Sequence, residues 1–501
     1  MPTTLPTISA SDNSVIDEVL VLGFALDKKS KKFSILSGEL RVDQGPLLQA
    51  LTDLGASGAS DEVIKLPGSA SKLILLTALT LKSDGSIAHE VLRRAAGAAA
   101  RSLAGTTSAT FALPQASKQD FQAIAEGALL GAYTFDEFRG SSKADRKPAL
   151  KKVTIYSKKA KDKSYLQGIK RAEIIAKYTH LTRDLINTPP SHLTPDSFSL
   201  RFKKLAASLG VKVEILNESQ LIKGGYGGII GVGQGSANPP RLLRLSYSGK
   251  GAKKRYAFIG KGITFDTGGL ALKPAQGMEA MKSDMSGAAA VCAAVLAIAE
   301  LKLPIHIDAW AALAENMVSD KATRPSDIIT IYGGKTVEVL NPDAEGRLVL
   351  ADAMVRAAEV GKKAGGLDGM VDVATLTGAQ VVALGTRTSA VMTNNESFRE
   401  QFLTLAEITG EAFWPMPLPE ELRASLDSPV ADMANIGDRM GGMLVAGLFL
   451  KDFVDSELPW LHLDIAGPAY NEAKAHGYTP VGGTGVALRT LVALAESSAA
   501  K

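Results

Sequence analysis

The sequence has one cysteine in 501 residues, so it allows no internal disulfide. That residue, Cys292, lies in "AAAVCAAVLAIAE" among small and apolar neighbours, and we interpret it as a packing residue rather than a nucleophile or a metal ligand. Long apolar runs are also lacking. The longest, from Ala288 to Ala299, meets Glu300 well short of the roughly 20 residues needed to span a bilayer. We therefore expect no membrane span.

The first residues, "MPTTLPTISASDNS", lack the basic region followed by an apolar segment that is typical of a secretory signal. We therefore expect a cytoplasmic protein.

Several well-known catalytic and nucleotide-binding motifs are missing. The chain has no GxSxG elbow and no GxxxxGK[ST] loop. His89 and Glu90 begin like HExxH, but Arg93 occupies the position of the second histidine. "GVGQGS" has Ser236 in place of the third glycine of a dinucleotide fingerprint. The six histidines form no ligand pair, which argues against a histidine-based zinc site.

The net charge is only +4, but residues 143 to 163 contain nine basic and two acidic side chains. Such a stretch is either an anion or nucleic-acid patch or a solvated linker. We favour the linker, because the lysines are not interleaved with a series of aromatic residues on which bases could stack.

A chain of 501 residues with 46% apolar residues is long enough for two or three globular domains. From residue 18, strand-like runs alternate with helical ones, which indicates a small N-terminal α/β domain over residues 1–160. A long helical pattern then runs into "TPPSHLTP", whose prolines end it. The strands expected in this part are 18–26, 71–79, 108–114 and 151–157, and the helices are 89–105, 120–138 and 164–187.

We assign residues 161–194 to a linker helix and connector, and residues 195–501 to a larger α/β domain with a central mixed sheet flanked by helices. Ligands of such sheets bind where strands end in loops. No fixed-period repeat is present. The expected helices here are 196–210 and 286–301, and the strands are 211–216, 241–247, 255–260 with its end at Lys261, and 305–313.

The first group of candidate site residues lies in "GKGITFDTGGLALKPAQGMEAMKSDMSGAAA". Lys261 and Asp266 flank an expected strand end, Lys273 follows a glycine turn, and Asp284 precedes a helix rich in small residues. Singly these are ordinary solvated lysines and a helix cap. Together they offer a metal oxygen ligands and one amine ligand.

The second group lies in "NPDAEGRLVL", where Asp343, Glu345 and Arg347 occupy alternate positions before an apolar run. Three charges spaced by two would project to one side of an extended segment, and burying them is costly unless something compensates them. A metal ion could do so. The alternative is a polar turn in which Asp343 or Glu345 caps the following helix.

These two segments resemble the two metal-binding signatures of the leucyl aminopeptidase family, the M17 class of cytosolic dinuclear metallopeptidases, whose second signature is usually written NTDAEGRL. The resemblance continues through "RDLINTPPSHLTP", "ATLTGA", "ANIGDRMGGMLVAGLFL" and "WLHLDIAGPA", in the same order. It implies a metal-dependent aminopeptidase of broad specificity with a preference for apolar residues such as leucine. It also implies an N-terminal domain concerned with assembly or regulation, a homohexamer and peptide substrates.

By this resemblance, two divalent ions, Mn²⁺ or Zn²⁺, activate a water and polarise a peptide carbonyl. Lys273 and Arg347 are the implied catalytic residues: Lys273 stabilises the oxyanion, and Arg347 holds a bicarbonate that acts as general base. Lys261 can bind metal only as a neutral amine, so we expect burial and the dications to lower its pKa. The implied metal ligands are Lys261, Asp266, Asp284, Asp343 and Glu345, with Asp266 and Glu345 shared between the ions and Asp284 also facing the substrate's α-amine.

The resemblance extends to the substrate cleft, with Met281, Asn341, Thr375, Leu376 and Gly378 as implied substrate-binding residues. Their alternative role is packing at strand ends.

Three positions depart from the common pattern: Pro342 for threonine, Ser286 for glycine, and Pro468 near the implied pocket floor. None removes a ligand, but each bears on substrate preference. Two other functions stay open, a DNA-binding or scaffolding hexamer and a dipeptidase of narrow specificity.

Overall fold

The computed structural model describes residues 4–13, 16–68 and 71–499. The chain forms two compact units, Met1–Leu181 with Glu472–Val481, and Thr182–Asn471 with Gly482–Lys501. The long helix α4 (Lys163–Asn187) belongs to the first unit up to Leu181 and to the second from Thr182. It ends before the two prolines at 189 and 190, as the sequence predicts.

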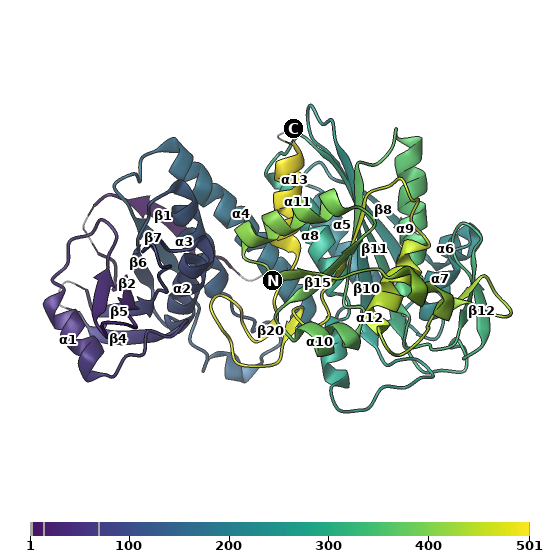
Figure 1. Ribbon diagram of the computed structural model, residues 1–501, viewed down its shortest axis with the longest axis horizontal. Helices are drawn as coiled ribbons and strands as arrows, with labels where there is room; N and C mark the ends of the chain where they lie inside the picture. The colour runs from purple at the N-terminus through teal and green to yellow at the C-terminus, as the bar shows by residue number, and fades with distance from the viewer. Residues whose placement is uncertain (1–3, 14–15, 69–70, 500–501) are drawn as a thin grey trace. The chain divides into compact units, whose positions relative to one another are not determined.

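A seven-stranded sheet forms the centre of the first unit, in the order β1-β7-β6-β2-β5-β4 with β3 paired to β2 (Figure 1). β3 and β4 run antiparallel to their neighbours and the other pairs are parallel. The elements are β1 (Thr7–Ser11), β2 (Val19–Leu26), β3 (Phe33–Leu36), α1 (Gly45–Asp53), β4 (Val63–Pro67), β5 (Leu73–Ala78), α2 (His89–Ser102), β6 (Ser108–Ala112), α3 (Lys118–Gly131), the 3-10 helix η1 (Ser141–Lys143) and β7 (Lys152–Tyr156).

Both faces of this sheet are covered. Along β2, Val19 and Val21 pack into the cluster that contains α2 and α3, whereas Leu20 and Leu22 pack into the cluster that contains α1. Such alternation follows from the two-residue period of a strand. A strand buried on both faces is apolar throughout, which explains why the sequence shows "VLVLGFAL" as an unbroken apolar run.

The second unit contains a mixed eight-stranded sheet in the order β16-β15-β18-β14-β10-β11-β9-β8. The central strands β18, β14, β10 and β11 are parallel to one another. Its strands are β8 (Lys212–Leu216), β9 (Arg241–Ser248), β10 (Arg255–Asp266), β11 (His306–Asn316), β14 (Gly369–Ala374), β15 (Ser389–Thr393), β16 (Phe413–Pro415) and β18 (Trp460–Asp464).

Helices flank this sheet, which confirms the predicted fold class. α8 contacts β10, β11 and β14 and packs with α13, while α7, α9 and α12 share one core cluster with the sheet. The helices are α5 (Pro195–Ala206), α6 (Glu218–Gly224), α7 (Gly227–Gly233), η2 (Met278–Ser283), α8 (Ser286–Glu300), α9 (Gly346–Lys363), α10 (Gly378–Leu384), α11 (Glu396–Thr409), η3 (Glu420–Leu426), α12 (Gly442–Lys451) and α13 (Leu488–Ala499). Two small sheets hold β12 (Asp327–Thr330), β13 (Thr336–Val339) and β17 (Met433–Ala434), and β19 (Tyr470–Asn471) and β20 (Gly482–Gly483).

Two element boundaries differ most from the sequence-based expectation. α3 ends at Gly131 instead of continuing to Phe138. β10 does not end at Lys261 but continues to Asp266, with an irregular register against β11 between Ile263 and Asp266. The strand therefore carries Lys261 within its length and Asp266 at its end.

The basic stretch at residues 143–163 is partly neutralised by acids from elsewhere in the first unit. Lys143 pairs with Asp136 at 3.2 Å, Lys152 with Asp17 at 2.9 Å and Lys161 with Asp12 at 2.7 Å. These are exposed lysines, whose pairs contribute little stability. The stretch is therefore less basic than its local composition indicates.

Helix α8 explains both the buried cysteine and the apolar run. Cys292 is fully buried, and burial raises the pKa of its thiol, so packing is its role. In the part of the chain that the structure describes, Met278–Glu300 is the one helical stretch long and apolar enough to cross a membrane. Burial of 94% of its most apolar window inside the protein is typical of a core helix.

Candidate metal centre and active site

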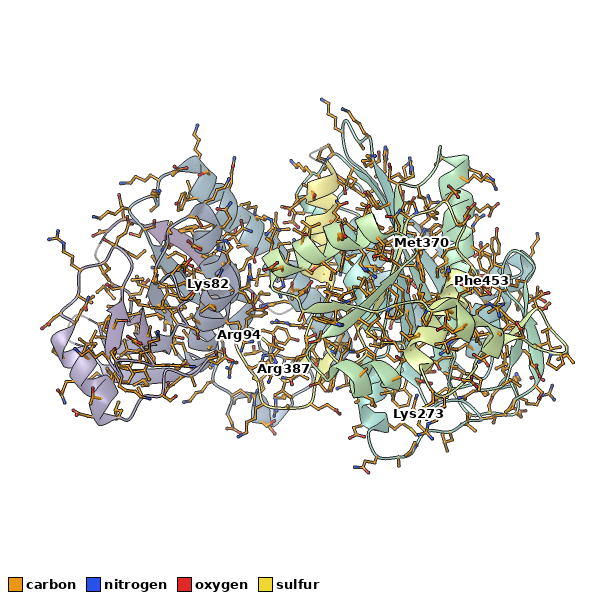
Figure 2. All side chains as sticks on the ribbon, in the orientation of Figure 1. Lys82, Arg94, Lys273, Met370, Arg387 and Phe453 are labelled. Carbon is orange, nitrogen blue, oxygen red and sulfur yellow. The ribbon has the colours of Figure 1, made fainter. Side chains whose placement is uncertain are left out.

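The candidate site lies where the four parallel strands of the second unit end. Asp266 ends β10, Asn316 ends β11, Asp464 ends β18, and Thr375 directly follows β14. Figure 2 labels Met370, at the start of β14, and, well below it in the view, Lys273 on the loop after β10. Ligands of open α/β sheets bind at the carboxyl ends of strands.

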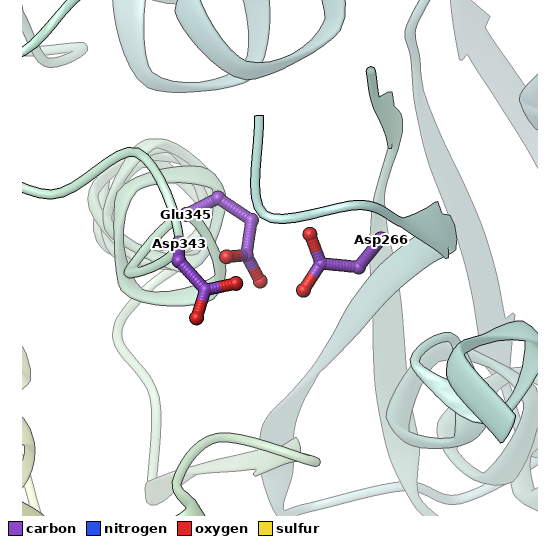
Figure 3. Close-up of side chains that lie close together, drawn as sticks. All are labelled: Asp266, Asp343 and Glu345. Atoms are coloured by element: carbon purple, nitrogen blue, oxygen red, sulfur yellow. The ribbon is translucent and has the colours of Figure 1, made fainter. Parts of the chain in front are cut away.

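Three carboxylates converge at this edge. Asp266, Asp343 and Glu345 each place one oxygen so that all three oxygens lie within 4.8 Å of one another. Figure 3 shows Asp266 pointing from the end of β10 toward the other two, which come from the segment that opens α9. Asp266 and Glu345 are 2% exposed. Buried like charges at this spacing need a compensating cation.

The segment that carries Asp343 and Glu345 is a turn, so the predicted extended geometry is wrong. The Ala344 N–H donates to the Asn341 carbonyl at 3.0 Å, and the backbone of Glu345 is already helical. Glu345 occupies the N-cap position of α9 but makes no side-chain cap hydrogen bond. Its carboxylate is therefore turned to the acidic cluster instead of the helix end, and the alternative role as a helix cap does not apply.

Lys261 lies between two buried carboxylates. Its ammonium is 2.8 Å from Asp284 Oδ1 and 2.9 Å from Glu345 Oε1, and it donates to the Thr375 carbonyl at 2.8 Å. The Thr375 hydroxyl in turn donates to Asp284 Oδ1 at 2.6 Å. Asp284, which precedes α8, is thereby joined to the same cluster.

Lys273 contacts the two carboxylates of the cluster that Lys261 does not pair with. Its ammonium is 2.8 Å from Asp266 Oδ2 and also pairs with Asp343. A tight loop puts it there: the Lys273 N–H donates to the Thr267 carbonyl at 2.9 Å, and Gly268 turns the chain with a φ of +84°. A Cβ at Gly268 would lie 2.8 Å from Asp343 Oδ1, so only glycine fits.

The donor set fits divalent metal ions. Asp284 Oδ2 and Glu345 Oε2 are buried and have no hydrogen-bond partner among the described residues. Buried carboxylate oxygens normally accept hydrogen bonds. Two such oxygens without a hydrogen-bond donor in one cluster therefore indicate that a cation is their partner. The four acids and the amine of Lys261 are the ligand types that Mn²⁺ and Zn²⁺ accept.

The carboxylates around Lys261 determine its pKa in the metal-free protein. Burial lowers it, but the adjacent carboxylates of Asp284 and Glu345 outweigh burial and raise the pKa above its usual value. The lowered pKa expected from the sequence refers to the metal-bound site, where the dications oppose the effect of these carboxylates. Lys261 can ligate as a neutral amine only if bound cations neutralise the carboxylates and reverse this sign.

Metal affinity should therefore depend on pH. Burial, with the neighbouring Asp266 carboxylate adding to it, raises the pKa of Glu345 to about 8, and burial raises that of Asp284 to about 6. Because these acids must lose protons to bind metal, we expect the affinity of the metal-free protein for Mn²⁺ to rise between pH 6 and 8 by up to about tenfold per unit. Isothermal titration calorimetry at several pH values measures it, and comparison of buffers counts the released protons.

The raised pKa of Glu345 also determines how the stability of the metal-free protein changes with pH. The folded-state pKa of Glu345 lies above its ordinary value of 4.5, so its contribution to the stability of the metal-free protein is present below that value. It is lost as the pH rises through about 8. Glu345→Gln should reduce the pH dependence of stability above pH 6; an unchanged profile in this variant would contradict the assignment.

Arg347 lies in the first turn of α9 and is 7% exposed. It donates through Nη1 to the Asn435 carbonyl at 2.7 Å, and its guanidinium lies 5.8 Å from the centre of the Phe449 ring. Among the described residues, no carboxylate lies within salt-bridge distance of it. Burial lowers its pKa to about 10, so it remains cationic at neutral pH.

The implied substrate-binding residues surround this cluster to different degrees. Thr375 is bonded directly to Lys261 and Asp284, and the Leu376 N–H donates to Asp464 Oδ1 at 3.1 Å. Gly378 is exposed at the start of α10. Asn341 accepts from the Asp343 N–H at 2.9 Å and so supports a candidate ligand. Met281 is half-buried in η2, and its carbonyl accepts from the Asp284 N–H at 3.2 Å.

The three departures from the family pattern are accommodated locally. Pro342 is buried, and its carbonyl accepts from Asn316 Nδ2 at 3.2 Å. The Ser286 hydroxyl donates to the Ser283 carbonyl at 2.5 Å, and Pro468 accepts from the Thr484 hydroxyl at 2.7 Å. None of the three touches the acidic cluster through these bonds.

Sequence reasoning missed Asn316. Its amide donates to Asp266 Oδ1 at 2.9 Å and to the Pro342 carbonyl at 3.2 Å, so it connects the end of β10 to the turn before α9. The only signal in the sequence is its place at the carboxyl end of the strand, two residues after the apolar run "AWAALA".

Comparisons with known proteins agree with this geometry. The chain matches the family model described as "Cytosol aminopeptidase family, catalytic domain" over residues 180–492, and the model of the N-terminal domain of the same family over residues 24–142. A probable cytosol aminopeptidase of Streptomyces avermitilis is 51% identical, with 99% of each chain covered. One from Nocardia farcinica is 47% identical, with 97% of this chain and 95% of the relative covered.

Solved structures give the same result. The bottromycin maturation enzyme BotP in complex with Mn superimposes with a TM-score of 0.84 at 35% identity, covering 96% of this chain and 99% of that chain. A mutant of tomato leucine aminopeptidase superimposes with a TM-score of 0.81 at 31% identity, covering 98% of this chain and 96% of that chain. The chain therefore belongs to the cytosol aminopeptidase family and is a metal-dependent peptide hydrolase that removes N-terminal residues.

Proposed function

We propose that this chain is a dinuclear aminopeptidase of broad specificity that prefers apolar N-terminal residues such as leucine. The observation that carries the proposal is the convergence of four carboxylates and two lysines at the ends of the parallel strands, with two buried carboxylate oxygens left without protein partners among the described residues. Lys261, Asp266, Asp284, Asp343 and Glu345 would hold two divalent ions, Mn²⁺ or Zn²⁺. BotP, which was solved with Mn, supports this metal class.

When bound, two such ions would polarise the scissile carbonyl and lower the pKa of the attacking water. Lys273 supplies the remaining positive charge. Its pKa is raised because the carboxylates, Asp266 foremost, outweigh the opposing effect of burial, so it stays protonated at neutral pH. Its side chain is 22% exposed, whereas that of Lys261 is 4% exposed. Lys273 is therefore the lysine that can reach a substrate oxygen and stabilise its developing negative charge.

Arg347 is suited to hold an anion that accepts a proton. Only Nη1 has a protein acceptor among the described residues, the Asn435 carbonyl, and Nε has no partner there. A planar guanidinium with free donors binds a planar anion such as bicarbonate through two parallel hydrogen bonds. We propose bicarbonate as the general base at this position.

The specificity for N-termini follows from charge. The cluster places buried carboxylates next to the point of hydrolysis, and Asp284 can accept from a free α-amine. The half-buried apolar side chains of Met281 and Leu376 support a preference for apolar first residues. The name of the relatives supports a cytoplasmic location, and we propose the family's homohexamer as the assembly.

Removing the metal should abolish hydrolysis. We expect chelation to lower the rate on leucine p-nitroanilide by at least about 100-fold, because the ions contribute several kcal/mol to transition-state stabilisation. Adding back Mn²⁺ or Zn²⁺ should restore the rate. The measurement is the release of p-nitroaniline by purified protein before chelation, after it and after reconstitution.

The matched control is Asp343→Ala, which should stay inactive after the same reconstitution. A panel of dipeptides and longer peptides separates broad from narrow specificity: hydrolysis confined to dipeptides would replace the broad specificity with that of a dipeptidase. A reconstituted wild type that cleaves nothing in the panel would contradict the proposed catalytic role.

A further inference from the structure

Asn435 closes the turn that carries Asp343. It directly follows β17 and is fully buried. Its Oδ1 accepts from the N–H groups of Leu340 at 2.8 Å and Asn341 at 3.2 Å. Its Nδ2 donates to the carbonyls of Asn341 at 2.7 Å and Ala344 at 3.4 Å. One amide side chain thus satisfies two donors and two acceptors of the segment from Leu340 to Ala344.

The main chain of the same residue holds Arg347. Its carbonyl accepts from Arg347 Nη1 at 2.7 Å, and its N–H donates to the Glu338 carbonyl at 2.9 Å. Among the described residues, this carbonyl is the one protein acceptor with which Arg347 forms a hydrogen bond. Asn435 therefore contacts both groups: its carbonyl orients Arg347, and its side chain holds the turn that carries Asp343.

Only a primary amide of this length matches the four backbone groups. A carboxylate would accept from the two N–H groups but would oppose the carbonyls of Asn341 and Ala344, and a methyl group would remove all four hydrogen bonds. Pro342, within this turn, has no N–H of its own to contribute. Besides the backbone bond from Ala344 to Asn341, the turn is held by the side chains of Asn435 and Asn316.

We infer that Asn435 is a positioning residue that fixes the guanidinium of Arg347 relative to the carboxylate of Asp343. It touches neither metal nor substrate, and acts through these two residues. The inference rests on the proposed function, because it gives Asn435 a catalytic effect only if Arg347 and Asp343 work in the same reaction. Residues that orient metal ligands in this way typically change metal affinity or activity by roughly 10- to 100-fold when replaced.

The test compares Asn435→Ala and Asn435→Asp with the wild type. We expect kcat to fall about 10- to 100-fold with KM changed less than about threefold, and Kd for Mn²⁺ to rise about tenfold by calorimetry. Asn435→Asp keeps the size and the two acceptor bonds and loses only the two donor bonds, so the two variants disturb the turn in different ways and each tests the inference separately. Kinetic constants and Kd are expressed per folded protein, so lost stability alone would leave them unchanged.

The matched control is Asn394→Ala. The Asn394 amide also bridges two backbone groups in the same unit, donating to the Leu458 carbonyl at 3.0 Å and accepting from the Trp460 N–H at 2.9 Å. Trp460 is at the start of β18, at the end of the sheet away from the acidic cluster. We expect this variant to lose stability while keeping kcat and the Kd for Mn²⁺.

A double-mutant cycle with Arg347→Ala separates the two paths. If Asn435 acts on catalysis through Arg347, its replacement should have little further effect on kcat in the Arg347→Ala background, while the effect on Kd for Mn²⁺ persists. Additive losses in kcat, or Asn435 variants with wild-type kcat and Kd, would overturn the inference. If wild type cleaves no peptide, the proposed function fails, but an unchanged Kd in both variants would still refute the link to Asp343.

Discussion

Replacing Asp266 by asparagine is expected to lower kcat/KM at least about 1000-fold on leucine p-nitroanilide, the equivalent of about 4 kcal/mol of transition-state stabilisation. The Asp266 carboxylate is the one member of the three-oxygen cluster that comes from the sheet, and it faces Asp343 and Glu345 across the site. An amide has about the same shape but no charge, so we expect the variant to keep the fold and to lose the metal ligand proposed at this position. Steady-state kinetics with saturating Mn²⁺, together with the bound metal content, measure the effect.

We also predict the effect of Asp266→Asn on stability. Asparagine can still accept from the Gly268 N–H and from Asn316, as Asp266 does now, but it loses the ion pair with Lys273. Against that loss, the repulsion between Asp266 and Glu345 disappears. We expect the free energy of unfolding of the metal-free variant to stay within about 1 kcal/mol of wild type, because these terms oppose each other. The stabilisation that Mn²⁺ gives the wild type should be absent.

Asp308→Asn is the matched control. Asp308 is a buried carboxylate in the neighbouring strand β11, but it pairs with Arg244 at 3.1 Å near the start of that strand. Its replacement should reduce stability and leave kcat/KM within about twofold. Asp266→Asn protein with more than about a tenth of wild-type activity and unchanged metal content would show that Asp266 is no ligand.

The sequence predicts which elements carry the site because strand and helix periods are local. "RYAFIG" and "IHIDAWAAL" are recognisable strands, and charged residues that follow them must lie at a sheet edge if the strands are parallel. No local pattern in the sequence predicts that Glu345 lies next to Lys261, because the two residues are 84 positions apart. That proximity entered through the resemblance of the two segments to one family, and the structure shows it as a contact of 2.9 Å.

The hydrogen-bond partners within the site could not be predicted from the sequence. Asn435 is important because β17, a strand of two residues, pairs with β13 and thereby faces the turn at Asn341. A two-residue strand has no period to detect. Likewise, the alternating charges from Asn341 to Glu345 suggest an extended segment, whereas the backbone bond from Ala344 to Asn341 and the side-chain bonds from Asn316 and Asn435 hold it as a turn.

Gly287→Ala should have the largest effect on stability. Gly287 is the second residue of α8, and a Cβ there would lie 1.9 Å from the Val373 carbonyl oxygen and 3.1 Å from the Lys261 backbone nitrogen. Both neighbours are backbone atoms of the central strands β14 and β10, which cannot move aside as a side chain can. We expect the free energy of unfolding to fall by about 3 kcal/mol, the upper part of the usual range for overpacking. Urea denaturation monitored by circular dichroism measures it.

Gly442→Ala is the control for this substitution. Gly442 also lies at the start of a helix in the same unit, and the nearest atom to an added Cβ is Ala379 Cβ at 3.8 Å, an ordinary contact. The alanine should leave stability unchanged or raise it by up to about 1 kcal/mol, because alanine favours helix over glycine. Equal losses in the two variants would mean that helix starts in general, and not the close approach of α8, are sensitive.

Activity should fall with Gly287→Ala even in molecules that remain folded. Asp284 lies three residues before Gly287, and its carboxylate meets the Lys261 ammonium at 2.8 Å only because α8 approaches the sheet this closely. A helix displaced by even about 1 Å would lengthen that contact, and displacements of this size cost about 100-fold in rate when they misplace reacting groups. Full kcat in the folded fraction would show instead that Asp284 tolerates the shift. The run of small residues in α8 would then serve packing alone.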